Sequence, residues 1–263
     1  MKRGFGSLLI LLLCIQPLWA EEVQPEALYT EKECVACHTE RDPDLVEQWR
    51  ITAHGEASIV GCSGCHGDRH QRPAQLMTIK AREDETCVGC HRGPAAHSYA
   101  TSKHGVINTI EANRQEWSAP LLVGNYRAPG CSYCHFYGGD HRDTMTPERG
   151  PEVRQWVCVG CHSPRYIREQ FANGKRQLEI ADLKLAEGDA LMATADTLTG
   201  DLCSSLKQRQ TDHRKNVLYG VGHQSPDYQW WHGQPALDGD LIRIRDAMDE
   251  VRRREQLGAD IVQ

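Results

Sequence analysis

The stretch "CVACH", residues 34–38, sets the pattern of this sequence. The same arrangement, Cys-x-x-Cys-His, returns four more times along the chain of 263 residues. The further copies are "CSGCH" (62–66), "CVGCH" (87–91), "CSYCH" (131–135) and "CVGCH" (158–162). Five short motifs therefore contain all of the twelve cysteines except Cys14 and Cys203.

The histidine after each second cysteine separates this motif from other uses of paired cysteines. Structural zinc sites combine two such pairs, or one pair with two spaced histidines, and disulfide frameworks need no adjacent histidine. Two thioether bonds to a haem, by contrast, leave the neighbouring imidazole beneath the iron. We therefore predict five covalent c-type haems, with zinc binding and disulfide pairing as the alternatives. The attachment cysteines are Cys34, Cys37, Cys62, Cys65, Cys87, Cys90, Cys131, Cys134, Cys158 and Cys161, and the proximal ligands are His38, His66, His91, His135 and His162.

The composition agrees with a chain that relies on cofactors for its core. Only three Phe are present, and aromatic residues make up 6% of the chain. Five porphyrins would supply the missing apolar mass, and their covalent and axial bonds would tie the chain together. We expect a mostly α-helical, multihaem cytochrome c fold, with loops and short helices around five haems and long helices after them.

The first residues have the layout of a secretory signal. Lys2 and Arg3 precede the apolar run "LLILLLCIQPLWA", and acidic residues follow Ala20. We expect cleavage after residue 20, export to the periplasm and no membrane span in the mature chain. The formal net charge of −6 argues against a nucleic-acid partner.

The chain after the signal divides into two regions that differ in composition and in hydrophobic pattern. Residues 21–163 hold all five motifs, joined by segments rich in Gly, Pro, Asp and Arg that predict loops and short helices. Residues 164–263 predict a helical region that packs on the haem domain.

A seven-residue repeat predicts a long helix from 165 to 202, where no proline interrupts the chain. Apolar residues recur every seven positions, with a small residue three places after each. A second helix is predicted over 241–263. This apolar seam could pack against another helix of the same subunit, or against a second subunit in a homo-oligomer. Its residues are Phe171, Leu178, Leu185 and Met192, followed by Gly174, Ala181, Gly188 and Ala195.

Thirteen histidines less the five proximal ones leave eight, which is enough to ligate every iron from its far side. A haem with two imidazole ligands carries electrons with little structural change, whereas a five-coordinate haem can bind substrate. The number of distal ligands therefore distinguishes an electron carrier from an enzyme. The eight are His54, His70, His97, His104, His141, His213, His223 and His232.

Several stretches together resemble the C-terminal half of the octahaem hydroxylamine oxidoreductase family and, more distantly, cytochrome c nitrite reductase. The resemblance covers about residues 58–263, and the front segment "ECVACHTERDPDLVEQWRITAHGEA" is similar to the first haem segment of the same superfamily. The carrying stretches are "CVGCH", "HSYATSKHG", "APGCSYCHFYGGDHRDT", "WVCVGCHSPRYIREQF" and "VGHQSPDYQWWHG".

The resemblance implies roles for individual histidines. The "SKHG" segment implies a distal haem ligand at His104, and the "DH" after the fourth motif implies one at His141. The histidine before the C-terminal aromatic segment, His223, is implied to be a third. The "RITAH" segment implies another at His54, and the position shortly after the second motif implies one at His70.

Two further residues match family positions at an open, catalytic haem. The resemblance implies that His97 faces substrate, although Ala95 and Ala96 stand where the family has a carboxylate. Tyr228 falls where the family has a tyrosine that crosslinks to the porphyrin, the alternative being an aromatic cluster with the two tryptophans that follow.

Two functions follow from these patterns. The first is a periplasmic five-haem cytochrome that carries electrons between other redox proteins or quinol-linked cytochromes. The second is an enzyme like hydroxylamine oxidoreductase or nitrite reductase, acting on small nitrogen or sulfur oxyanions at one open haem, with His97 and Tyr228 as catalytic residues.

Overall fold

The computed structural model describes residues 28–70, 79–112, 128–145, 150–194 and 200–261. The expected signal, residues 1–20, lies outside them. The described residues form helices and loops, with one isolated β-bridge between Leu28 and Arg69. The helices are α1 (Glu31–Arg41), α2 (Pro43–Arg50), α3 (Ala53–Glu56), α4 (Cys62–His66), α5 (Ile79–Arg82), α6 (Asp84–Val88), α7 (Pro94–Ala100), α8 (Lys103–Glu111), α9 (Cys131–His135), the 3₁₀ turn η4 (Tyr137–Gly139), α10 (Gly150–Cys158), α11 (Pro164–Met192), α12 (Gly200–Gly222), α13 (Pro226–Trp230) and α14 (Gln234–Ile261).

Polar N-caps fix where many of these helices begin. Thr30 caps α1 in a reciprocal arrangement with Glu33, so that two backbone amides at the helix start are satisfied. Ser163 accepts a hydrogen bond from the amide of Tyr166, and Pro164 occupies the first turn of α11. The same combination of a serine cap and a proline begins α13. Local sequence thus fixes the helix starts in both halves of the chain.

The short helices α1 to α10 bury few side chains of their own. Helices α1, α4 and α6 bury none. Among the described residues before α11, the buried hydrophobic ones are Val46, Ala128, Tyr133 and Val157. Since a folded region needs an apolar interior, this part of the chain fits one that is completed by porphyrins.

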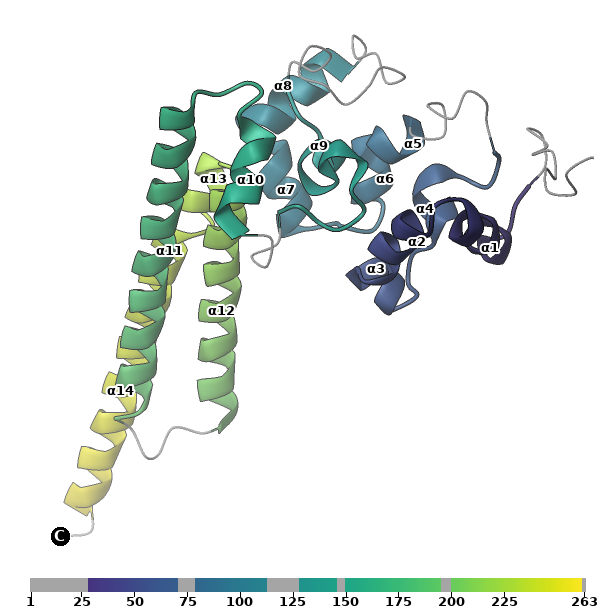
Figure 1. Ribbon diagram of the computed structural model, residues 1–263. Coiled ribbons are helices and arrows are strands. Elements are labelled where there is room, and N and C mark those ends of the chain that lie inside the picture. Colours follow the sequence, from purple (N-terminus) through teal and green to yellow (C-terminus); the bar gives the residue numbers. More distant parts are fainter. Residues whose placement is uncertain (1–27, 71–78, 113–127, 146–149, 195–199, 262–263) are drawn as a thin grey trace, which may run out of the picture.

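The long helices α11, α12 and α14 lie side by side as a bundle that extends away from the short helices (Figure 1). Two clusters of buried side chains hold the bundle together. Each of them joins all three helices, and one contains Met192, Leu206, Ile244 and Met248. The other contains Ala181, Val217 and Leu237.

The predicted apolar seam closes within the chain. Leu178 and Leu185 pack against the second cluster, and Met192 is part of the first. A Cβ atom added at Gly174 would lie 2.5 Å from Val221 of α12, so the small residues of the seam permit close helix contact. Of the two alternatives, the intramolecular one describes this single chain; Phe171 of the seam stays partly exposed, and Ala195 lies outside the described residues.

The helix boundaries differ from the sequence prediction at two places. Helix α11 ends at Met192, whereas the prediction continued it to residue 202. Thr194, Thr197 and Thr199 follow this end in the sequence, and threonine favours a helix less than the preceding Ala- and Leu-rich turns do. Helix α14 begins at Gln234, earlier than the predicted start at residue 241, because Pro235 is tolerated in a first helical turn.

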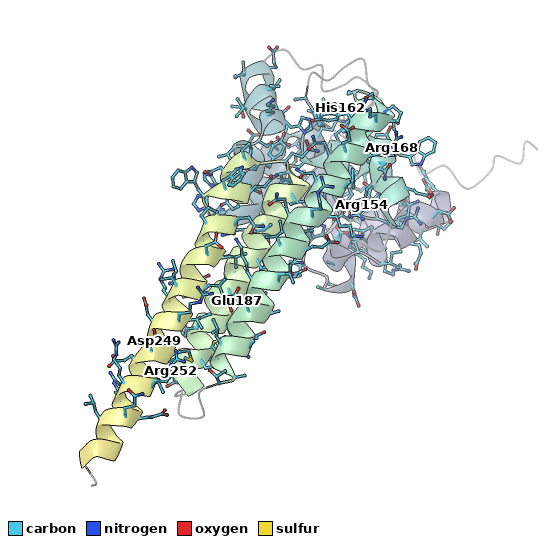
Figure 2. All side chains as sticks on the ribbon, turned by 90° about the vertical axis from the view of Figure 1, so that its left-hand side faces the viewer. Arg154, His162, Arg168, Glu187, Asp249 and Arg252 are labelled. Carbon is cyan, nitrogen blue, oxygen red and sulfur yellow. The ribbon has the colours of Figure 1, made fainter. Side chains whose placement is uncertain are left out.

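The bundle meets the short helices at one end. Helix α12 contacts α7, and α13 packs between α12 and α14. Figure 2 shows His162 and Arg168 at this end, whereas Glu187, Asp249 and Arg252 lie along the bundle away from it. None of the described helices combines the length and apolarity that crossing a bilayer requires.

Candidate haem-binding centres

Each motif forms one helical turn. In the second and fourth motifs the turn is a short helix of its own, α4 and α9. In the third and fifth motifs it follows the end of a helix, where the amide of the histidine donates to the carbonyl of the first cysteine, at 2.9 Å for His91 and 2.9 Å for His162. The turn brings both cysteines and the histidine to one place, as attachment of one porphyrin requires.

Four proximal histidines each face a second histidine from a different part of the chain. The ring centroids are 6.4 Å apart for His38 and His70, and 5.8 Å apart for His91 and His54. They are 6.0 Å apart for His66 and His141, and 6.0 Å apart for His162 and His104.

These separations match the space that an iron would occupy. A metal–nitrogen bond of about 2 Å on each side, together with the distance of roughly 1 Å from nitrogen to ring centre, puts two imidazole centroids about 6 Å apart. The residues present therefore fit a metal held between two histidines, which is the arrangement of a six-coordinate haem.

The fifth proximal histidine, His135, has the half-buried His223 as its neighbour. The two rings are close enough to interact electrostatically, and this interaction together with burial lowers the pKa of His223 to about 4, burial being the larger cause. Burial, with the facing histidine as the smaller cause, also lowers the pKa of His104 and of His141. Neutral imidazoles are the form that binds a metal.

Hydrogen bonds orient the rings of the fifth pair. Nδ1 of His135 lies 3.0 Å from Oδ1 of Asp143, and Nδ1 of His223 lies 2.6 Å from Oγ of Ser98. A partner on one ring nitrogen fixes the orientation of an imidazole and leaves its other nitrogen for a metal. The sequence did not identify Asp143 or Ser98, because neither is adjacent to the histidine that it contacts.

The five motifs lie in space in the order in which they occur in the sequence. Figure 1 shows the helices that carry them following one another from α1 through α4, α6 and α9 to α10. Cys62 lies within electrostatic range of Cys34, and Cys65 lies within that of Cys87. The side chains of Cys87 and Cys131 touch, and Cys134 interacts with Cys158, so each motif neighbours the next.

A cavity of about 450 Å³ lies between the third motif and helices α7 and α8. Its lining includes Asp84, Val88 and Arg92 on one side and His97 and Tyr99 on the other. Cavities of this size hold small-molecule ligands and cofactors in other proteins. Its position beside the third motif fits an attached porphyrin.

The two candidate catalytic residues lie together. Nδ1 of His97 is 3.2 Å from the hydroxyl of Tyr228, and the rings meet edge to face. Tyr228 is buried, and burial with the smaller effect of Asp227 raises its pKa. His232 completes the group, with ring centroids 4.9 Å from Tyr228 and 6.2 Å from His97.

The last unassigned histidine, His213, lies in the bundle. Its Nδ1 is 2.5 Å from the buried carboxylate of Asp240, which Arg209 and Arg243 also approach. A buried carboxylate with three positively polarised partners is a structural network of the bundle.

Two families match parts of this chain. "Seven times multi-haem cytochrome CxxCH" matches residues 56–153, and "Cytochrome c554 and c-prime" matches residues 19–67. A protein of Kuenenia stuttgartiensis described as a probable nitrite reductase-hydroxylamine oxidoreductase fusion is 38% identical over 74% of this chain. The alignment spans only 37% of that relative.

Two solved structures share the fold at low sequence identity. One is from a reducing HAO-like protein complex of Kuenenia stuttgartiensis, with a TM-score of 0.51 and 18% identity over 88% of this chain and 87% of that chain. The other is described as a hypothetical multiheme protein, with a TM-score of 0.55 and 14% identity over 74% of this chain and 59% of that one.

Proposed function

We propose that this chain, which belongs to the multihaem cytochromes c of the hydroxylamine oxidoreductase superfamily, is a periplasmic electron carrier with five haems. The leader at residues 1–20 supports export, and the five Cys-x-x-Cys-His motifs support the count. Its partners would be other redox proteins or quinol-linked cytochromes.

The single observation that carries the proposal is the pairing of histidines. Every proximal histidine has a second histidine as its neighbour, and four of the pairs are spaced as two ligands of one iron would be. When bound, haems ligated in this way supply irons that change oxidation state with little change in coordination. The distal ligands would be His70, His54, His141, His104 and His223, opposite His38, His91, His66, His162 and His135 respectively.

The order of the motifs in space supports a path from one end of the short-helix region to the other. Cysteines of consecutive motifs lie near one another all the way from the first motif to the fifth. Cys37 and Cys161 are exposed at the two ends of this series, and Cys90 of the third motif is exposed as well. Partners could therefore approach the first and the last motif from solvent.

Charge differs between the two ends. Around the first motif, α1 carries three carboxylates, Glu31, Glu33 and Glu40, against two cations, Lys32 and Arg41. Beside the fifth motif, Tyr166 stacks on His162 at 4.8 Å between ring centroids, and the neighbouring Arg165 and Arg168 are exposed. The two ends thus differ in their balance of charge, although Arg165 is paired with Glu169, and such a difference would favour different partners because surface charge steers the approach of a redox protein.

The contact of His97 with Tyr228 supports a second candidate, an enzyme that acts on small nitrogen or sulfur oxyanions. The relative named for nitrite reductase and hydroxylamine oxidoreductase suggests this class of substrate. Such chemistry needs an iron with an open position. The four spaced histidine pairs, with His223 beside His135, would leave none, and for this reason the carrier is the stronger proposal.

Intact-mass measurement of the exported protein tests the cofactor count. The mass should equal the chain from Glu21 onward plus five haems. Replacing Cys34 and Cys37 with serine should remove one haem and leave four. A wild-type mass with fewer than five haems in fully matured protein would contradict the proposal.

A further inference from the structure

None of the residues His97, Asp227 and His232 is among the ten proposed haem ligands, although His97 also lines the cavity beside the third motif. One ligand atom from each lies within 4.8 Å of those of the other two. Two imidazoles and a carboxylate are a ligand set that proteins use for divalent transition metals. We propose that these three residues bind a non-haem divalent metal ion, with zinc as the reference ion.

The turn that carries two of the ligands is held in place by the backbone. The carbonyl of Asp227 accepts hydrogen bonds from the amide of Trp231 at 2.9 Å and from that of His232 at 3.1 Å. The side chain of Asn216 in α12 donates to the carbonyl of His232 at 3.0 Å. The turn thus places the carboxylate of Asp227 near Nε2 of His232, at 3.6 Å.

The third ligand comes from α7, which is fixed against the same turn. Oγ1 of Thr101 lies 3.0 Å from Oγ of Ser225, the N-cap of α13. Ser98, next to His97, contacts Nδ1 of His223, which directly follows α12. These two contacts set the position of α7 and bring His97 to the turn.

Tyr228 orients the ring of His97. Its hydroxyl is 3.2 Å from Nδ1 of His97, and its side chain is only 5% exposed, so it forms a rigid partner. When Nδ1–H donates to this hydroxyl, the lone pair of Nε2 is left for a metal. Metal-binding histidines commonly have such a partner on their second nitrogen.

The ligand set favours zinc and similar borderline ions over calcium or magnesium, which prefer oxygen ligands. Tetrahedral zinc, with bonds of about 2 Å, needs ligand atoms roughly 3.3 Å apart. The present separations require a small contraction, which His97 and His232 can make because both side chains are exposed. Three protein ligands would leave a fourth position for water.

Elemental analysis of the haem-loaded, untagged protein tests the proposal. The protein is equilibrated with zinc, dialysed against zinc-free buffer, and analysed for zinc and iron together. We expect one retained zinc per chain in the wild type and an affinity at least about 100-fold lower in His232→Ala and Asp227→Asn. The iron content and the visible haem spectrum should not change, which separates loss of the zinc site from loss of the fold.

Two further variants make the test specific. His213→Ala removes a histidine that lies in the bundle and should retain zinc like the wild type. Tyr228→Phe removes only the orienting hydroxyl and should weaken zinc binding by about 10- to 100-fold. The proposal is wrong if the wild type retains no zinc, or if His232→Ala and Asp227→Asn retain as much as His213→Ala. Neither result bears on the haem ligands, because the three residues are not among them.

Discussion

The ring of His70 lies nearly parallel to that of His38, at 18° between ring planes and 6.4 Å between centroids. His38 belongs to the first motif, whereas His70 follows the second motif by a few residues. The chain after one motif therefore reaches back to face the histidine of another.

The other facing pairs also join distant parts of the chain. His54, between the first two motifs, faces His91 of the third, and His141, after the fourth motif, faces the second-motif residue His66. A ligand bound between each pair would tie these segments together. We propose that the haems thereby fix the tertiary structure of a region whose helices bury few side chains of their own.

The facing pair at the third motif gives the first prediction. Replacing His54 with alanine should leave one iron with a vacant position, because the opposite ligand His91 is unchanged. The ferric variant should show a new high-spin signal by electron paramagnetic resonance, and the reduced variant should bind carbon monoxide. His213→Ala is the matched control and should show neither change. Carbon monoxide binding by both variants, or by neither, would contradict the assignment of His54.

The basic end of the series gives a second prediction. Arg168→Glu changes an exposed residue near His162, so it should slow oxidation of the reduced protein by the anion ferricyanide on the order of a few-fold. The effect should shrink at high salt, because salt screens exposed charges. Stopped-flow absorbance gives the rate.

A second charge-reversal variant of the same protein serves as the control. Arg252→Glu makes the same change on α14, far from the motifs (Figure 2). It should leave the ferricyanide rate within experimental error of the wild type. Equal slowing by both variants would mean that net charge, and not the fifth-motif end, determines the rate.

The buried carboxylate of the bundle gives a third prediction. Asp240 is 1% exposed and has Arg209, Arg243 and His213 as partners. Asp240→Ala would leave these groups without their common acceptor and should lower the free energy of unfolding of the bundle by about 3–5 kcal/mol. Guanidinium unfolding followed by far-UV circular dichroism measures the change.

An exposed ion pair on the same helix serves as the comparison. Asp249 pairs with Arg252 on the surface of α14, and both side chains are more than half exposed. Asp249→Ala should cost no more than about 1 kcal/mol. A cost for Asp240→Ala as small as this would show that the network contributes little to stability.

Patterns repeated along the chain predicted much of this structure. The mostly helical multihaem fold was predicted correctly from five motifs and a shortage of apolar residues, and the repeat through Leu178, Leu185 and Met192 correctly indicated a helix with an apolar seam. The prediction missed the end of α11 because it took only a proline as a helix end, whereas the threonines that follow Met192 also favour a helix weakly.

Contacts between distant segments could not be read from the sequence in the same way. Nothing local to His54 indicates that it faces the third motif and not the first, because this depends on how the chain folds back. The same holds for His97, which meets Asp227 and His232 only through the packing of α7 on α12 and α13. The proximity of Asp227 and His232 to Tyr228 in sequence was the one available signal for that group.

The claim that every iron has two histidine ligands is tested most directly by electron paramagnetic resonance of the fully oxidised, five-haem protein. The facing histidines predict low-spin signals alone, unchanged when nitrite or hydroxylamine is added. A high-spin haem in the wild type whose signal shifts with either ligand would contradict the account, because it would place an open, substrate-binding iron in a molecule proposed only to carry electrons.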